Sequence, residues 1–202
     1  SHEILKATHM KHHAHTNDID SDPDFFHGNA ENWWQAAVNV NVSYNDDGPA
    51  MKVIQQHMEK DPKFKESMEK GGIWSLFFYF AQIVLAILYP LETLFLWWIP
   101  KRVATSYLGI VFSYFPHSGL GKGRYKDTRF WTNKIPRYLN HSMQIHTMHH
   151  MYPRICHYDE AKAIEALKPF MIERGMPGAE HIPERIRWNP VTYIREVYFG
   201  GR

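Results

Sequence analysis

The chain has 202 residues and a formal net charge of +2, and 44% of its residues are hydrophobic. The near balance of 23 basic and 21 acidic residues excludes nucleic-acid binding driven by overall charge, and the apolar content excludes disorder. A single cysteine excludes an internal disulfide framework and any metal site built from several cysteines, which leaves 14 histidines as the unusual feature of the composition.

The first 24 residues predict a short helix followed by a turn. Residues 1–15 contain five histidines and apolar residues at helical spacing, with no Pro or Gly to interrupt them. Residues 16–24 (TNDIDSDPD) have the composition of a turn. Their alternating aspartates resemble a calcium-binding loop, but Pro23 stands where that loop requires Gly, so we interpret the segment as a turn alone.

Residues 25–71 are polar and mixed in composition. The pair Trp33-Trp34 is the main aromatic feature, and residues 45–49 predict a turn. A charged helix is predicted over residues 51–70. We therefore assign this segment to the part of the chain that faces water.

Residues 73–91 (IWSLFFYFAQIVLAILYPL) contain no charged residue. At 1.5 Å per residue, such a helix matches the hydrocarbon core of a bilayer, which is about 30 Å thick. A buried helix of a large soluble protein would have the same pattern. A chain of 202 residues has little with which to cover a helix that is apolar on every face, so we predict a membrane-spanning helix.

A second apolar stretch, residues 93–115, is interrupted by Pro100-Lys101-Arg102. Two charges near the middle of a span would cost about 2.5–3.5 kcal/mol each, a cost that snorkelling or a kink would lessen. From residue 116 onward the chain is polar. A helix is predicted over residues 159–173, with Gly175 placed to end it.

Two histidine clusters share one spacing. Residues 9–13 (HMKHH) and 146–150 (HTMHH) both have the pattern H-x-x-H-H. On a helix, positions i, i+3 and i+4 lie on one face, so each cluster directs three imidazoles to one side. One cluster alone could be a solvated helix face. Two identical clusters flanking an apolar segment indicate a site for iron, copper, nickel or zinc formed by His9, His12, His13, His146, His149 and His150.

The two clusters also constrain the membrane topology. If both bind one centre, they lie on the same side of the membrane, and an even number of crossings separates them. The 43 residues from Ile73 to Phe115 suit two crossings of about 20 residues each. Both flanks are basic and therefore cytoplasmic by the positive-inside rule, through Lys52, Lys60, Lys63, Lys65 and Lys70 before the hairpin and Lys122, Arg124, Lys126, Arg129, Lys134 and Arg137 after it.

The two H-x-x-H-H clusters resemble the histidine motifs, called histidine boxes, of the membrane di-iron superfamily of fatty-acid desaturases, carotenoid hydroxylases and alkane or sterol hydroxylases. That superfamily carries H-x(3–4)-H, then H-x(2–3)-H-H and, beyond a transmembrane hairpin, H/Q-x(2–3)-H-H. The second box is matched by His9, His12 and His13, which Asp22-Pro23-Asp24 follows, and the third by His146, His149 and His150. The resemblance covers nearly the whole chain up to residue 175.

Within the superfamily, Pro116-His117 and residues 124–129 (RYKDTR) resemble the bacterial beta-carotene hydroxylase branch. There a P-H element and an R-Y-x-D-T-R element follow the last membrane span. His117 stands where many relatives place an extra ligand, although a histidine capping the span at the interface is the alternative. The first box would lie upstream of Ser1, so we expect a carboxy-terminal portion of a longer protein that is inactive alone.

The resemblance implies an oxidoreductase that hydroxylates a carotenoid or desaturates a fatty acyl chain, with O2 as co-substrate. It implies two Fe ions and the ligands His9, His12, His13, His117, His146, His149 and His150. It also implies a lipid bilayer and an apolar lipid substrate as partners and, because no haem or flavin motif is present, a ferredoxin-type electron donor. The other histidines lack box spacing and are expected at the surface or around the site: His2, His15, His27, His57, His141, His157 and His181.

The expected fold is an all-α, multi-pass membrane protein. Residues 1–71 carry the second box, residues 72–116 form a transmembrane hairpin, and residues 117–202 form a cytoplasmic helical cap with the third box and a C-terminal tail. The alternative function is a non-enzymatic membrane metal-binding protein whose histidines buffer zinc or copper. A membrane zinc hydrolase fits less well, because neither box contains a carboxylate base.

Overall fold

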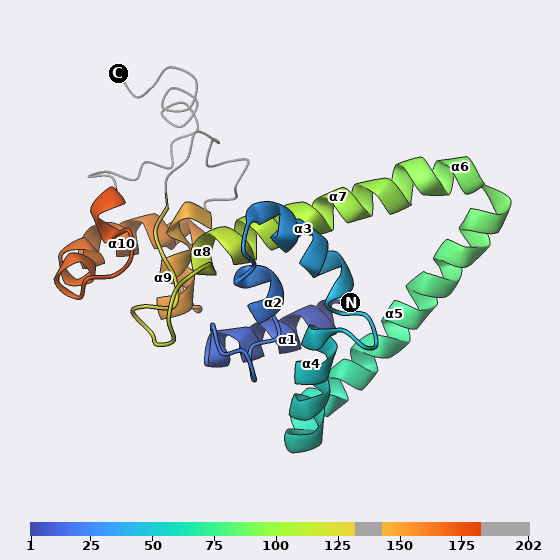
Figure 1. Ribbon diagram of the computed structural model, residues 1–202, viewed down its shortest axis with the longest axis horizontal. Helices are drawn as coiled ribbons and strands as arrows, with labels where there is room; N and C mark the ends of the chain where they lie inside the picture. The colour runs from blue at the N-terminus through green and yellow to red at the C-terminus, as the bar shows by residue number, and fades with distance from the viewer. Residues whose placement is uncertain (132–142, 183–202) are drawn as a thin grey trace, which may run out of the picture. The chain divides into compact units, whose positions relative to one another are not determined.

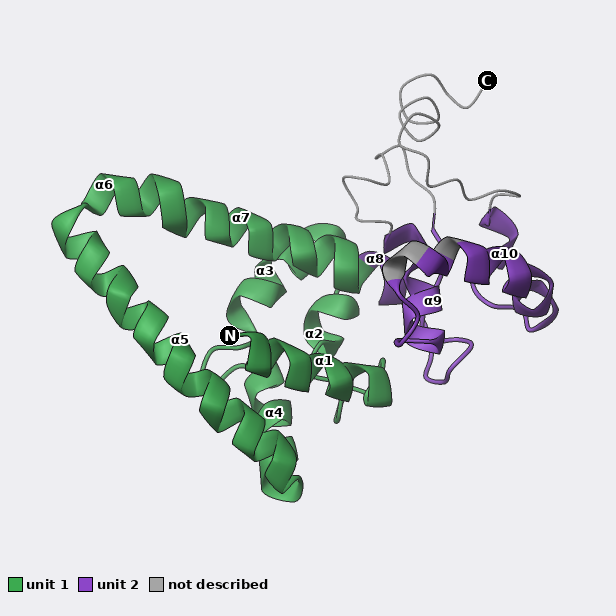
Figure 2. Cartoon of the chain, turned by 180° about the vertical axis from the view of Figure 1, so that it is seen from behind, with its two compact units in different colours: residues 1–114 green, residues 115–202 purple. Residues whose placement is uncertain are grey.

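The computed structural model describes residues 1–131 and 143–182 and is helical throughout, with no strand in these ranges (Figure 1). The all-α prediction is therefore confirmed for the described residues. The chain divides into two compact units, residues 1–114 (unit 1) and residues 115–202 (unit 2) (Figure 2). The predicted tail beyond residue 182 lies outside the described residues.

Unit 1 begins with helix α1 (His2–His15), which confirms the first predicted helix. Ser1 caps it, because the Ser1 hydroxyl accepts a hydrogen bond from the backbone N–H of Ile4 at 3.4 Å. At the other end, the Thr16 hydroxyl donates to the carbonyl of His12 at 2.8 Å. Asn17 then turns the chain with a φ of 63°, in the left-handed region that Asn tolerates better than most residues.

The segment interpreted as polar and mixed contains two helices, α2 (Phe25–Gly28) and α3 (Trp33–Val42). Asn32 caps α3 by accepting the N–H of Gln35 at 2.8 Å. The sequence analysis did not assign α3, since its valines and asparagines have low helix propensity. Its buried residues are the small pair Ala36 and Ala37, so packing rather than propensity decides its structure.

The prediction of a single helix over residues 51–70 is wrong, because two helices divide that range. Helix α4 (Pro49–Lys60) ends at Asp61, and α5 (Pro62–Leu88) begins directly after it. Pro62 has no N–H to continue the hydrogen bonds of α4, and the residue before a proline favours extended backbone. Asp61 is extended, with φ −130° and ψ 98°, and its carboxylate accepts the N–H groups of Lys63 and Phe64.

Helix α5 contains most of the first apolar stretch. Among the described residues it is the one helix that is long and apolar enough to cross a membrane. Almost none of its apolar side chains is buried in the protein. It ends at Tyr89, just before Pro90, where the chain reverses direction (Figure 1).

The second apolar stretch returns as one continuous helical run. Its parts are α6 (Pro90–Thr93), η1 (Leu94–Trp98), α7 (Ile99–Leu108) and η2 (Gly109–Tyr114). Segments η1 and η2 are π-helical turns, which widen the helix locally and often occur at functional places. Pro100 lies two residues after η1, and a local π-helical adjustment accommodates the hydrogen bond that a proline cannot make.

Two contacts fix the arrangement inside unit 1. Helix α1 packs on α5, where Gly71 lies so close to Ile4 that a Cβ at this position would be 2.5 Å from the Ile4 side chain. Helix α3 packs on α7 and η2, where Gly109 lies against Val40 in the same way. Small residues at both crossings let the helices approach closely.

Unit 2 contains α8 (Phe115–His117), η3 (Met143–Ile145), α9 (His146–Met151), α10 (His157–Glu173) and η4 (Ala179–His181). The predicted last helix is confirmed as α10, and Gly175 follows it with a φ of 61°. The unit has its own apolar core, formed by Phe130, Ile145, Met148, Met151, Ile164, Met171, Met176, Ala179 and Ile182.

Candidate metal centre

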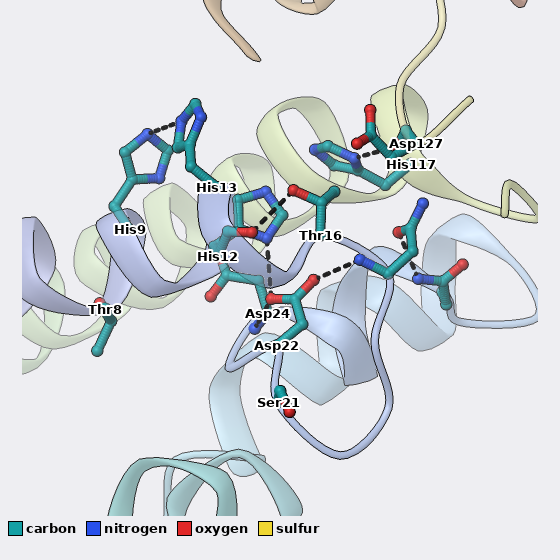
Figure 3. A network of polar contacts seen from close by, with 12 residues as sticks. Thr8, His9, His12, His13, Thr16, Ser21, Asp22, Asp24, His117 and Asp127 are labelled. Atoms are coloured by element: carbon teal, nitrogen blue, oxygen red, sulfur yellow. Dashed lines mark hydrogen bonds and ion pairs between the residues drawn. The ribbon is translucent and has the colours of Figure 1, made fainter. Parts of the chain in front are cut away.

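The second box, formed by His9, His12 and His13, lies on α1 in unit 1. The Nε2 atoms of His9 and His13 are 3.1 Å apart, and their ring centres are 4.5 Å apart (Figure 3). The ring of His12 lies 5.9 Å from that of His9 and 5.8 Å from that of His13. The helical spacing therefore brings three imidazoles together, as the pattern predicts.

The distance between the two Nε2 atoms is informative. Two nitrogens bound to one ion at 2.0–2.1 Å, at angles between right and tetrahedral, stand about 2.8–3.4 Å apart. The 3.1 Å between His9 and His13 lies in this range. The pair fits two ligands of one metal ion without rearrangement of α1.

His12 is held from behind by Asp22. The Nδ1 of His12 donates to Oδ1 of Asp22 at 2.9 Å, and both side chains are buried (Figure 3). A carboxylate only accepts, so the proton of the imidazole is on Nδ1 and the lone pair is on Nε2. This carboxylate–histidine pair is the arrangement that orients metal-binding histidines in proteins.

Asp22 is fixed in turn by the backbone of its own turn. It is 1% exposed, and it accepts the N–H of Asn17 at 2.9 Å and the N–H of Asp24 at 2.8 Å in addition to His12. The interpretation of residues 16–24 as a turn is correct but incomplete. The turn also places the buried carboxylate of Asp22 against His12. The Asp-Pro-Asp triplet at residues 22–24 was the available sequence signal for this contact.

The residues around the second box affect the protonation of its histidines. Burial lowers the pKa of His9, and the neighbouring His12 lowers it further, which favours the neutral ring that a metal needs. Burial alone would raise the pKa of Asp24. The nearby His27 and His12, with a 2.6 Å hydrogen bond from Tyr44, outweigh burial and lower that pKa.

His27 was expected near the site or at the surface, and it is 3% exposed. Its Nε2 lies 3.8 Å from Oδ1 of Asp24, and burial lowers its pKa. His57 donates to the carbonyl of Ser21 at 2.7 Å and so supports the turn that carries Asp22. Neither residue belongs to a motif with box spacing, so the sequence analysis could not assign a specific role to either.

The third box, formed by His146, His149 and His150, lies on α9 in unit 2. The Nε2 atoms of His146 and His150 are again 3.1 Å apart, with ring centres 4.7 Å apart. Met148 and Met151, on the other side of this short helix, are buried in the core of unit 2. The core therefore fixes the helix, and the helix presents its histidines as a group that includes His149, 5.3 Å from His146.

His117 joins the histidines of unit 2. Its ring is 4.7 Å from that of His150 and 5.8 Å from that of His146, and it is 1% exposed. The Nδ1 of His117 donates to the carbonyl of Asp127 at 2.9 Å (Figure 3). A carbonyl only accepts, so the lone pair of this ring is also on Nε2.

Residues 124–129 hold this cluster together. Arg124 donates to the carbonyl of Met151 at 3.0 Å, at the C-terminal end of α9 where a cation is favourable. The carbonyl of Asp127 holds His117, and the N–H of Arg129 donates to the carbonyl of Pro116 at 2.9 Å. The R-Y-x-D-T-R element thus braces both the box helix and the added histidine.

The donor atoms suit a metal that prefers imidazole. Each unit offers a pair of Nε2 atoms at ligand spacing and one further ring whose Nδ1 is held by an acceptor. Iron, zinc, copper and nickel all accept such donors. Of the remaining histidines, His181 is exposed and pairs with Glu180, and His141 lies outside the described residues.

The chain matches the fatty acid desaturase family over residues 1–179, which is most of its length. It belongs to this family, whose members are membrane-associated and generally use two irons and O2. No curated protein and no solved structure matches the chain. The family membership agrees with the resemblance drawn from the boxes.

Proposed function

We propose that this protein is an O2-dependent di-iron oxidoreductase that oxidises an apolar lipid. The observation that carries the proposal is the pair of Nε2 atoms 3.1 Å apart in each histidine box. The family supports the reaction class. The proposed iron ligands are those given by the boxes and the added histidine: His9, His12, His13, His117, His146, His149 and His150.

Two bound irons would supply the activation of O2 with two external electrons and the oxidation of an unactivated C–H bond. Asp22 and the Asp127 carbonyl accept hydrogen bonds from Nδ1 of His12 and His117. The proton of each ring is therefore on Nδ1, and the Nε2 lone pair is the one that would bind a metal. The lowered pKa of His9 keeps that ring neutral at physiological pH. Histidine also resists oxidation better than a thiolate ligand would.

The reaction balances with an external electron donor. Substrate C–H, O2, two electrons and two protons give an alcohol and water, and loss of a second hydrogen in place of oxygen insertion gives a double bond and two waters. The sequence contains no haem or flavin motif, so we propose a ferredoxin-type protein as the source of the electrons.

We propose that the apolar stretches cross the membrane twice and that both boxes lie on the cytoplasmic side. Helix α5 is long and apolar enough for one crossing. The return run from α6 to η2 exposes large apolar side chains, among them Phe95, Leu96 and Trp98, as a lipid-facing segment would. Basic residues flank both ends, as the positive-inside rule requires.

For the substrate we propose a carotenoid ring, with a fatty acyl chain as the alternative. The support is the resemblance of Pro116-His117 and residues 124–129 to one branch of the superfamily. In the structure these residues contact His117 and the end of α9, which are parts of the proposed metal centre. Either substrate is apolar and would enter from the bilayer.

Two measurements on the full-length protein test the proposal. Elemental analysis should find two irons per chain; zinc or copper instead of iron would support a metal-buffering membrane protein and refute the oxidase. Expression in cells that make beta-carotene should yield hydroxylated carotenoid with unchanged fatty acids. New unsaturated acyl chains with untouched carotene would assign the acyl substrate.

A further inference from the structure

Helix α3 has its apolar side chains on the outside. Trp34, Val38 and Val42 follow one another at i, i+4 and i+8 and so share one face of the helix. They are 65%, 45% and 47% exposed. The helix contains no charged residue, and the one polar residue at the edge of this face, Asn41, is hydrogen-bonded to α7.

The polar side chains of α3 make contacts inside the protein. Asn39 donates to the carbonyl of Phe26 at 2.6 Å, and Asn41 donates to the Ser106 hydroxyl on α7 at 2.9 Å. The buried residues of α3, Ala36 and Ala37, are apolar as well, so the helix is apolar on both its inner and its outer side. A surface helix of a water-soluble protein has polar residues toward solvent instead. The arrangement of α3 suits an environment in which water cannot satisfy polar groups.

The packing of α3 is of the kind found between membrane helices. At Gly109 a Cβ would lie 2.7 Å from the side chain of Val40, so this position needs its glycine. The buried residues Ala36 and Ala37 are also small, and the Ser106 hydroxyl donates to the carbonyl of Ala37 at 3.2 Å. Small residues with interhelical hydrogen bonds are typical where lipid replaces water.

An arginine joins α7 to α3, and its long side chain can reach the head-group level from a position deeper in the span. Arg102 of α7 donates to the side-chain carbonyl of Asn41 at 3.1 Å, and its guanidinium lies 5.5 Å from the centre of the Trp98 ring. Arginine and tryptophan are both favoured at the boundary between head groups and acyl chains. The exposed apolar surface of α7, including Ile99 and Val103, adjoins this point.

We propose that α3 is an interfacial helix whose apolar face, formed by Trp34, Val38 and Val42, rests in the lipid bilayer. Its 10 residues extend about 15 Å, half of what a crossing needs, so it lies in the boundary region rather than across the membrane. The exposed residues Asp46 and Asp47 follow it and return the chain to water. The proposal rests on the membrane association of the family and is independent of the reaction.

Site-directed spin labelling tests this placement. The exposed Cys156 is replaced by Ser, and a nitroxide is attached to the full-length protein through Val38→Cys or Val42→Cys, each in its own variant. The protein is placed in nanodiscs of phosphatidylcholine and phosphatidylglycerol. Both labels should collide with O2, which concentrates in lipid, several-fold more often than with a water-soluble nickel chelate.

The matched control is Asp46→Cys in the loop that directly follows α3, where the nickel chelate should collide more often than O2. Labels at positions 38 and 42 that behave like this control would overturn the proposal. Labels shielded from both reagents would also overturn it, because protein from this chain or a second copy would then cover the face. No labelled position belongs to a histidine box, so the result does not depend on iron content or activity.

Discussion

In each unit a histidine is oriented by an acceptor that holds its Nδ1 proton. In unit 1 the acceptor is the carboxylate of Asp22, and in unit 2 it is the backbone carbonyl of Asp127. A carboxylate makes the ring it holds a stronger donor, whereas a carbonyl mainly fixes its direction. Of the proposed ligands, we therefore expect His12 to depend most on one side chain outside the boxes.

Replacing that carboxylate should weaken metal binding without unfolding the turn. Asp22→Asn keeps the size of the side chain, but it removes the charge and places an NH2 group among three donors, His12 Nδ1 and the N–H groups of Asn17 and Asp24. We expect iron affinity to fall about 10–100-fold. Competition with a chelator, followed by elemental analysis, measures this fall.

Asp20→Asn is the control, since Asp20 lies in the same turn and is exposed. It should leave iron affinity unchanged. Equal affinities for the two variants would show that Asp22 does not orient a ligand. Circular dichroism on both proteins separates loss of metal from loss of helix.

The sequence predicts the boxes well and their supports poorly. The pattern H-x-x-H-H is local and specific, so His9 and His13 are found at ligand spacing, as are His146 and His150. Asp22 has only turn composition around it, and its bond to His12 depends on the path of the chain after α1. His27 has no pattern at all, and only its burial beside Asp24 distinguishes it.

At the scale of elements, the position of the second box depends on how α1 packs against α5. Gly71 makes the closest approach, and Lys11 adds an ion pair of 2.9 Å to Asp61 at the start of α5. The carboxylate of Asp61 also caps α5. One junction therefore begins α5 and fixes the helix that carries three imidazoles.

Two adjacent glycines allow the contact between α1 and α5 to be tested. Both lie inside α5, so Gly→Ala at either should add about 1 kcal/mol of helix stability. A Cβ at position 72 meets nothing within 4 Å, whereas at position 71 it lies 2.5 Å from the side chains of Ile4 and Ser1. That overpacking costs about 1–3 kcal/mol.

We therefore expect Gly72→Ala to raise the midpoint of thermal unfolding in detergent and Gly71→Ala to lower it relative to Gly72→Ala. Circular dichroism at 222 nm provides the measurement. If the two variants have the same midpoint, α1 does not pack on α5 at this glycine.

Local signals identified the helices that need no distant partner. Helices α1 and α10 have caps or stop residues beside them in the sequence, and α5 has its uncharged run. The break at Asp61 was missed because the charged pattern continues across it, although Pro62 was the available signal. Helix α3 was missed because its valines and asparagines have low helix propensity and because its apolar residues occur on both the buried and the exposed side, so no amphipathic period stands out.

At the scale of the whole molecule, each of the two units carries a histidine cluster. Unit 1 offers three box histidines, and unit 2 offers three more with His117. A non-haem iron site uses at least three protein ligands. The proposed ligand set includes both boxes, so loss of a ligand from either should reduce the iron that the chain binds.

Single histidine variants test this expectation in the full-length protein. We expect His12→Ala and His149→Ala each to reduce bound iron below two per chain and to abolish lipid oxidation, because each removes one donor from the proposed centre. Both residues lie outside the apolar run of α5, so insertion into the membrane should be unchanged. His181→Ala is the control, since that side chain is exposed and pairs only with Glu180 in the described part of the chain. Full iron content and turnover in the His149→Ala variant would show that the third box does not bind the metal. A loss limited to one of the two variants would show that a single box binds it.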